Sequence, residues 1–125
     1  MASAVDTAVI AVMGVFFLGM GMYALVAPAM LVRPFGIILE HATSRSEVRA
    51  VYGGFGLAIA AVLGYAAVAA GPHRTGILLA VGMALAGMAF GRLVSAVVDD
   101  RTACYPNWFY FGVEAVAAAA LLIAA

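Results

Sequence analysis

The sequence predicts an all-α membrane protein: an integral four-helix bundle with a long, partly apolar loop between its first two helices. Of its 125 residues, 67% are hydrophobic and only 10% are charged, with no lysine and a mean hydropathy of +1.15. Soluble domains carry roughly 25% charged residues, so this composition indicates an integral membrane protein. The chain also has four apolar runs, most of which reach the roughly 20 residues that a helix needs to cross the hydrocarbon. It lacks the alternation in segments of about 10 residues that is typical of a membrane β-barrel.

We expect a single transmembrane domain over residues 1–125, with helices at about 2–27, 47–70, 75–98 and 107–125. The first apolar run could be mistaken for a signal peptide, because Ala27-Pro28-Ala29 resembles a cleavage site. However, the region before it carries Asp6 and no Arg or Lys, and the apolar stretch is too long for a signal peptide. We therefore expect a retained first helix.

Glycine occurs throughout the first three runs, where small residues would let membrane helices approach closely. The third run contains Gly87-Met88-Ala89-Phe90-Gly91, which matches the GxxxG motif. We interpret these glycines as packing positions within the bundle, with a dimerisation motif as the alternative. Because so small a bundle has a large outer surface, we also expect a homo-oligomer or a subunit of a larger membrane complex, surrounded by the lipid bilayer.

Arginine positions predict the orientation in the membrane. If the helices cross in turn, the loops at 28–46 and 99–107 lie on one side, whereas the loop at 71–74 and both termini lie on the other. The first side carries Arg33, Arg45, Arg49 and Arg101, against Arg74 on the second. Because cytoplasmic loops are rich in Arg and Lys, we expect a multi-pass protein of the bacterial inner membrane with both termini on the non-cytoplasmic side.

The loop at 28–46 is long for a connection and is apolar through Phe35-Gly36-Ile37-Ile38-Leu39. Pro28 and Pro34 interrupt regular helix there. We expect this loop either to lie in the membrane interface or to fold back over the mouth of the bundle as a lid or re-entrant turn.

The second helix is predicted to begin with a capping box at Ser44-Arg45-Ser46-Glu47, in which the Ser44 hydroxyl accepts from the Glu47 amide. Glu47 is therefore either a helix cap or a functional carboxylate. Arg49 and Tyr52 follow three positions apart, so we expect their side chains to share one helix face.

A polar stripe runs along the otherwise apolar third helix. Arg92, Ser95 and Asp99 are spaced i, i+3, i+7 and so share a face. At 1.5 Å per residue, Arg92 lies about 10 Å below the level of Asp99. Glu114 lies at a similar depth on the antiparallel fourth helix, with Asn107 on the same face. We therefore predict a salt bridge between Arg92 and Glu114 if the two helices face each other.

Three motifs stand out together: Ser-Glu-x-Arg-x-x-Tyr-Gly-Gly, Gly-Arg-x-x-Ser with a following Asp, and a Glu in the last helix. Their positions are Ser46, Glu47, Arg49, Tyr52, Gly53, Gly54, Gly91, Arg92, Ser95, Asp99 and Glu114. Over nearly the whole chain this pattern resembles a bacterial four-helix membrane family, domain of unknown function 4345, and more weakly DoxX-like proteins, some linked to quinone-related redox complexes. Ser46 stands where that family has Asn, which bears only on a side-chain amide contact. The resemblance implies a shared polar site and names no activity.

Our main hypothesis is a binding site: an intramembrane pocket that opens to the cytoplasmic face. Arg49 and Arg92 would hold an anionic or carbonyl-bearing head group, because planar guanidinium donors suit carboxylate, phosphate and quinone oxygens. The apolar bundle would take the tail of a lipid-like or quinone-like amphiphile. The predicted ligand-binding residues are Arg49, Tyr52, Arg92, Ser95, Asp99 and Glu114.

Three alternatives use the same residues. A membrane enzyme could use Glu47 or Glu114 as acid or base on a hydrophobic small molecule, with Tyr52 or an arginine as electrophile. A proton-coupled transporter could use the same carboxylates, although the chain lacks the two inverted halves common in transporters. In a purely structural protein, the predicted charge pair would only fix the register of two helices.

Residue types argue against other classes of site. Cys104 is the only cysteine, so one chain can form neither a dithiol pair nor a cysteine metal cluster. His41 and His73 lie in connections on opposite sides of the membrane, and arginines lie close to the carboxylates. We therefore expect no haem and no metal from this chain alone. A net charge of zero gives nucleic-acid binding no electrostatic support.

Overall fold

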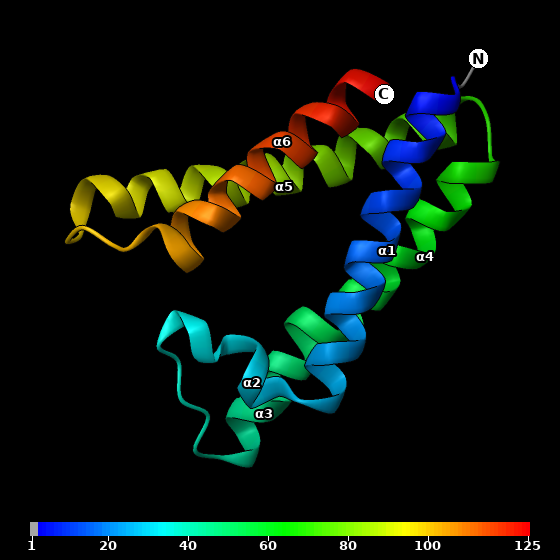
Figure 1. The fold of residues 1–125 in the computed structure, drawn as a ribbon. Helices are drawn as coiled ribbons and strands as arrows, with labels where there is room; N and C mark the ends of the chain where they lie inside the picture. The colour runs from blue at the N-terminus through cyan, green and yellow to red at the C-terminus, as the bar shows by residue number, and fades with distance from the viewer. Residues whose placement is uncertain (1–2) are drawn as a thin grey trace. The chain divides into compact units, whose positions relative to one another are not determined.

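A computed structural model describes residues 3–125, which form helices and connections with no β-strand among them (Figure 1). Four helical segments are long and apolar enough to cross a membrane, namely Ala4–Val26, Ala42–Val68, Pro72–Val98 and Cys104–Ala124. The predicted fold class, an all-α membrane protein with four spanning helices, is confirmed. The second segment begins five residues before position 47, because the helix includes polar residues that hydropathy alone assigns to the loop.

The chain divides into two compact units. The N-terminal unit is Ile10–Val68, and the C-terminal unit combines Met1–Val9 with Ala69–Ala125. Helix α1 (Ala4–Val26) begins with a capping box that the sequence patterns had not singled out. The Asp6 amide donates to the Ser3 hydroxyl at 3.0 Å, and the Ser3 amide donates to the Asp6 carboxylate at 3.5 Å. These bonds satisfy two amide groups at the start of the helix that have no partner within it.

In the N-terminal unit, α1 lies side by side with α4 (Phe55–Val68), and glycines bring their backbones into near contact. A Cβ atom added at Gly21 would lie 2.9 Å from the Gly53 carbonyl oxygen and 2.9 Å from the Leu57 amide nitrogen. A Cβ atom added at Gly56 would lie 3.2 Å from the Gly21 Cα atom. Only residues without a Cβ atom fit at such a crossing, as small residues do in membrane helix pairs.

The GxxxG motif plays no such part in its own helix pair. In the C-terminal unit, the close contact is at Gly82, where an added Cβ atom would lie 2.9 Å from Leu122 Cδ2. At Gly87 and Gly91 an added Cβ atom would meet no described atom within 4 Å. Gly87 and Gly91 are therefore not packing positions in the α5–α6 pair, because the side of α5 that faces α6 carries Gly82 instead.

The connection between α1 and α4 is largely helical. It contains α2 (Pro28–Val32), a 3-10 turn η1 (Arg33–Phe35), an extended stretch and α3 (Ala42–Val48). Pro28, Val32 and Val48 are buried in it, so this segment has a small core of its own. The capping box predicted at Ser44 is wrong, since α3 begins at Ala42 and places Ser44 inside the helix.

Helix α3 runs into α4 through η2 (Arg49–Gly54), a π-helical turn in which the Phe55 amide donates to the Ala50 carbonyl five residues back. The wider turn changes the angular spacing of side chains, so the three-residue spacing of Arg49 and Tyr52 no longer stacks them as an α-helix would. Turns of this kind occur mostly as single insertions inside α-helices, frequently at functional sites.

The C-terminal unit is an antiparallel pair of helices, α5 (Pro72–Val98) and α6 (Phe109–Ala124), joined through a loop and the short segment η3 (Cys104–Trp108) (Figure 1). Pro72 opens α5, where a missing amide hydrogen costs nothing. His73 and Arg74, which we expected in a connection, lie in the first turn of α5. The buried apolar side chains of the pair are Leu78, Val81, Leu85, Ala89, Ala117, Ala118 and Leu121.

The contact at Gly21 can be tested against a neighbour on the same helix. Gly21→Ala is expected to lower the free energy of unfolding by about 1–3 kcal/mol, because the new methyl group meets backbone atoms that cannot rotate away. Gly19→Ala has open space around it and should be neutral or stabilise by up to about 1 kcal/mol. Unfolding in detergent, followed by circular dichroism, measures both. Equal stability of the two variants would contradict the close crossing.

Candidate functional site

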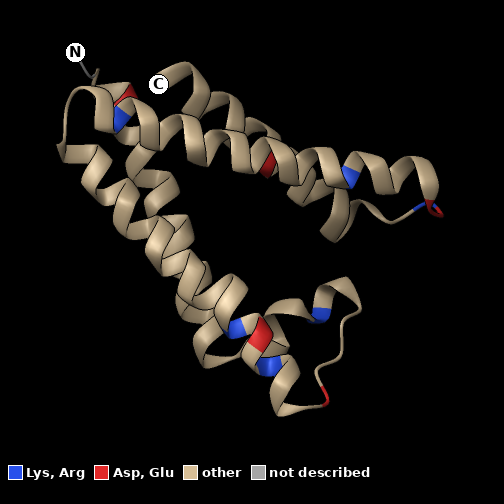
Figure 2. Ribbon diagram, turned by 180° about the vertical axis from the view of Figure 1, so that it is seen from behind, with Lys and Arg blue, Asp and Glu red and all other residues tan. Residues whose placement is uncertain are grey.

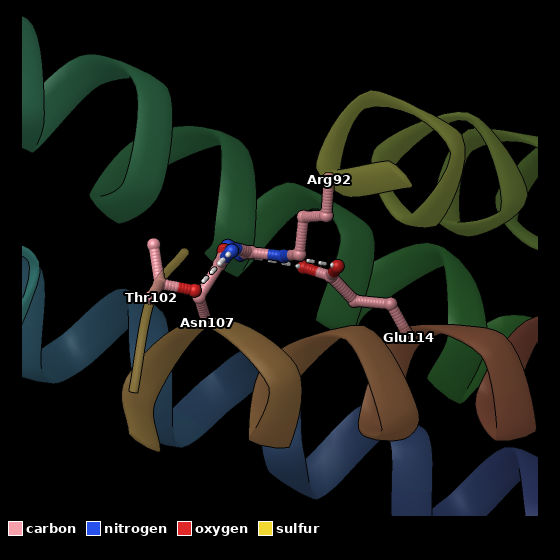
Figure 3. A network of polar contacts seen from close by, with 4 residues as sticks. All are labelled: Arg92, Thr102, Asn107 and Glu114. Carbon is pink, nitrogen blue, oxygen red and sulfur yellow. Dashed lines mark hydrogen bonds and ion pairs between the residues drawn. The ribbon is translucent and has the colours of Figure 1, made fainter. Parts of the chain in front are cut away.

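Arg92 and Glu114 form a two-pronged ion pair between α5 and α6 (Figure 3). The Arg92 Nε–H donates to Glu114 Oε1 at 2.7 Å, and Arg92 Nη2 donates to Glu114 Oε2 at 3.1 Å. Two parallel charge-assisted bonds of this kind fix both distance and orientation. The salt bridge predicted from the matching depths of the two residues is confirmed.

Asn107 and Thr102 extend this pair toward the α5–α6 connection. Arg92 Nη1 donates to Asn107 Oδ1 at 3.0 Å, and Asn107 Nδ2 donates to Thr102 Oγ1 at 3.4 Å. The sequence had placed Asn107 on the same face as Glu114 without making it a partner of Arg92, and it gave no sign of Thr102. The spacing of Asn107 and Glu114, seven residues apart and so two turns of one helix face, was the signal that could have identified the contact.

The two charges differ in burial. The Glu114 side chain is only 7% exposed, whereas the Arg92 side chain is 22% exposed. The carboxylate is therefore enclosed by its partner and the helices, while about a fifth of the Arg92 side chain stays accessible. Burial of a charge is tolerated in this way when the opposite charge and its hydrogen bonds are supplied locally.

Aromatic rings gather at the same end of α6. The Arg92 Cζ atom lies 5.9 Å from the centre of the Tyr110 ring, within the range of a cation–π contact. Neighbouring ring centres in this group lie 5.2 to 6.1 Å apart. The rings are Tyr105, Trp108, Phe109, Tyr110 and Phe111. Such a group suits the boundary between hydrocarbon and head groups.

Two predicted members of the polar stripe lie apart from the ion pair. Ser95 and Asp99 are exposed, and neither side chain is among the hydrogen-bond partners of Arg92 in residues 3–125. Asp99 has left the helix, with extended backbone angles, and its amide donates to the Ser95 carbonyl at 2.9 Å. Because α5 ends at Val98, Asp99 does not lie on the helix face that Arg92 and Ser95 share.

The remaining predicted residues belong to the N-terminal unit. Arg49 Nε–H donates to the Leu25 carbonyl at 3.0 Å, which caps one of the open carbonyl groups at the end of α1. Tyr52 and Glu47 are both exposed. The hypothesis that these residues and the Arg92 network share one pocket stays a prediction.

The described residues form no metal-binding group. Within residues 3–125, no three or more His, Cys, Asp or Glu side chains are arranged so that they could hold a metal ion. Cys104 is a free, exposed thiol. The C-terminal unit instead holds a cationic donor, the Arg92 guanidinium group, which is fixed by Glu114 and lies beside the Tyr110 ring.

The model of a family described as Domain of unknown function (DUF4345) matches residues 5–125. The chain belongs to this family. The match confirms the resemblance drawn from the three motifs, and it includes both Arg49 and the Arg92–Glu114 pair. No curated protein and no solved structure matches the chain.

The ion pair predicts a strong coupling between its members. Arg92→Met or Glu114→Leu alone should lower the free energy of unfolding by about 3–5 kcal/mol, because each leaves the other charge uncompensated. The double variant should lose clearly less than the sum of the two, and a double-mutant cycle of unfolding in detergent measures the difference.

The neighbouring exposed charges serve as a matched control for this cycle. Asp100 and Arg101 are exposed in the α5–α6 connection. Asp100→Asn and Arg101→Gln should each change the free energy of unfolding by less than about 0.5 kcal/mol, and the two changes should add. Additive losses at Arg92 and Glu114 would show that the pair contributes no coupling.

Proposed function

We propose that this DUF4345 protein binds an amphiphile with an anionic or carbonyl-bearing head group, lipid-like or quinone-like in structure, with Arg92 as the anchor. One observation carries the proposal. The Arg92 guanidinium is oriented by Glu114 and Asn107, yet the side chain is 22% exposed beside the Tyr110 ring. A donor that is held in position in advance loses little conformational freedom when a ligand binds.

Asn107 is the partner that a ligand would replace. Its amide oxygen is neutral, so its bond to Arg92 Nη1 is weaker than the two bonds to the Glu114 carboxylate. A carboxylate, phosphate or quinone oxygen could take the place of Asn107 without disturbing the ion pair. The ring of Tyr110, with Tyr105 and Phe109 next to it, would lie beside the planar or apolar part of the ligand.

We favour binding over catalysis because Glu114 is fully engaged in its ion pair with Arg92. Both of its oxygens accept hydrogen bonds from Arg92, so proton transfer would first require two charge-assisted bonds to break. Glu47, the other candidate acid or base, is exposed at the end of α3.

The proposed setting is the bacterial inner membrane, with the arginine-rich connections on the cytoplasmic side and both termini outside. Because the four helices follow one another across the membrane, the end of α1 and the end of α5 would then lie on the cytoplasmic side. Assembly into a homo-oligomer or a larger membrane complex belongs to the same proposal.

Native mass spectrometry of the full chain, gently extracted and then supplied with a fatty acid or a short-chain benzoquinone, tests the binding. We expect a retained adduct with at least one of the two probes. Arg92→Lys should weaken the adduct about tenfold or more, because lysine keeps the charge and loses the planar donors that a head-group oxygen meets.

Arg101→Lys is the matched control, since it makes the same change at an exposed arginine in the α5–α6 connection. It should leave the adduct unchanged. Absence of any adduct, or equal retention by Arg92→Lys and the parent protein, would overturn the proposal. Circular dichroism of each variant separates weaker binding from loss of fold.

A further inference from the structure

A second cationic surface lies in the N-terminal unit, where α3 meets η2. Arg45 and Arg49 stand one above the other on successive turns, because the Arg49 amide donates to the Arg45 carbonyl. Residues four apart on a helix share a face, whereas Glu47 is two positions from each and lies about 200° around the axis. The two guanidinium groups therefore point to one side, with the nearest carboxylate in sequence on the other.

Arg49 is fixed in place by α1. Its Nε–H donates to the Leu25 carbonyl at 3.0 Å, and the structure gives its two terminal nitrogens no hydrogen bond within residues 3–125. Those nitrogens belong to an exposed side chain. A guanidinium group with its inner nitrogen bonded and its outer nitrogens exposed is suited to hold a phosphate group through two donors.

An apolar surface accompanies the two arginines. We define the connecting lobe as residues 27–49, that is α2, η1, the extended stretch, α3 and Arg49. Met30 and Ile37 are about half exposed, and Ile38 is 81% exposed. The lobe follows directly on the membrane-spanning α1, so these side chains lie where helix ends meet the head groups.

The charges of the N-terminal unit all lie at the end that carries the connecting lobe, as the coloured positions in Figure 2 show. They are three arginines, Arg33, Arg45 and Arg49, against two glutamates, Glu40 and Glu47. Positive charge next to an exposed apolar segment at a membrane surface is the combination that binds anionic lipid.

We propose that the connecting lobe is a binding surface for an anionic phospholipid. Arg45 and Arg49 bind the phosphate-bearing head group, and Met30, Ile37 and Ile38 insert beside its acyl chains. The proposal uses none of the residues of the Arg92 network, so it stands independently of the ligand proposed there.

The test places a fluorescent reporter in the lobe by making Ile38→Trp in a Trp108→Phe background, which removes the only native tryptophan. The full chain is reconstituted in vesicles of phosphatidylcholine with a fixed fraction of phosphatidylglycerol, and either one lipid or the other carries the brominated, quenching chains. We expect emission typical of an apolar environment and stronger quenching by the anionic lipid. The preference should be about fivefold for each arginine near the surface.

Arg45→Gln, which removes one charge from a residue with no described side-chain hydrogen bond, should reduce the preference about fivefold. Adding Arg49→Gln should abolish it, while glutamine keeps a donor for the Leu25 carbonyl. Arg101→Gln removes the same charge from the C-terminal unit and should leave the preference unchanged.

Three results would overturn the proposal. Emission typical of water would show that the lobe does not enter the membrane, and equal quenching by the two lipids in the parent protein would show no preference for anionic lipid. Loss of the preference on addition of inorganic phosphate, but not of chloride at equal ionic strength, would assign the arginines to a free phosphate instead. Circular dichroism of the variants confirms that the helices are retained.

Discussion

The absence of water from the hydrocarbon is the constraint on which the structure depends. A backbone amide or carbonyl that crosses the membrane must find its partner within the protein, and helices achieve this within one segment. The remaining difficulty lies at the helix ends, where the first amides and last carbonyls have no partner. Here Ser3 and Asp6 close one end of α1, and the Arg49 side chain reaches the Leu25 carbonyl at the other. A residue first regarded as a ligand-binding arginine is thus also part of the scaffold.

The same constraint shapes the charged groups inside the helices. Glu114 is almost fully enclosed, and the structure meets the cost by giving each of its oxygens a donor from Arg92. Arg92 in turn uses a third donor on Asn107, which ties the end of η3 to the C-terminal third of α5. The pair joins two helices whose other contacts are apolar, so it sets their register as well as their separation. Arg92 can therefore both fix the packing of α5 against α6 and hold the proposed ligand.

Much of this could be predicted from the sequence, and the failures have physical causes. The four spans follow from hydropathy, and the Arg92–Glu114 pair follows from counting residues along two antiparallel helices. Glycine content shows that a close approach is permitted but not which face uses it, so the sequence did not distinguish Gly82 from Gly87 and Gly91. The role of Thr102 depends on how the chain turns between α5 and α6, and no local pattern encodes that path.

The π-helical turn at η2 also has a consequence for how this family can change. A π-turn is equivalent to one residue inserted into an α-helix, and each residue of an α-helix turns the chain by about 100°. Deleting a single residue between Arg49 and Gly54 would let the segment close into ordinary α-helix. Because the wide turn accommodates the extra residue locally, the helix before it and α4 would keep nearly the same relative orientation. A one-residue change in the length of η2 would therefore turn the side chains within η2 while Arg45, in α3, keeps its direction relative to α4.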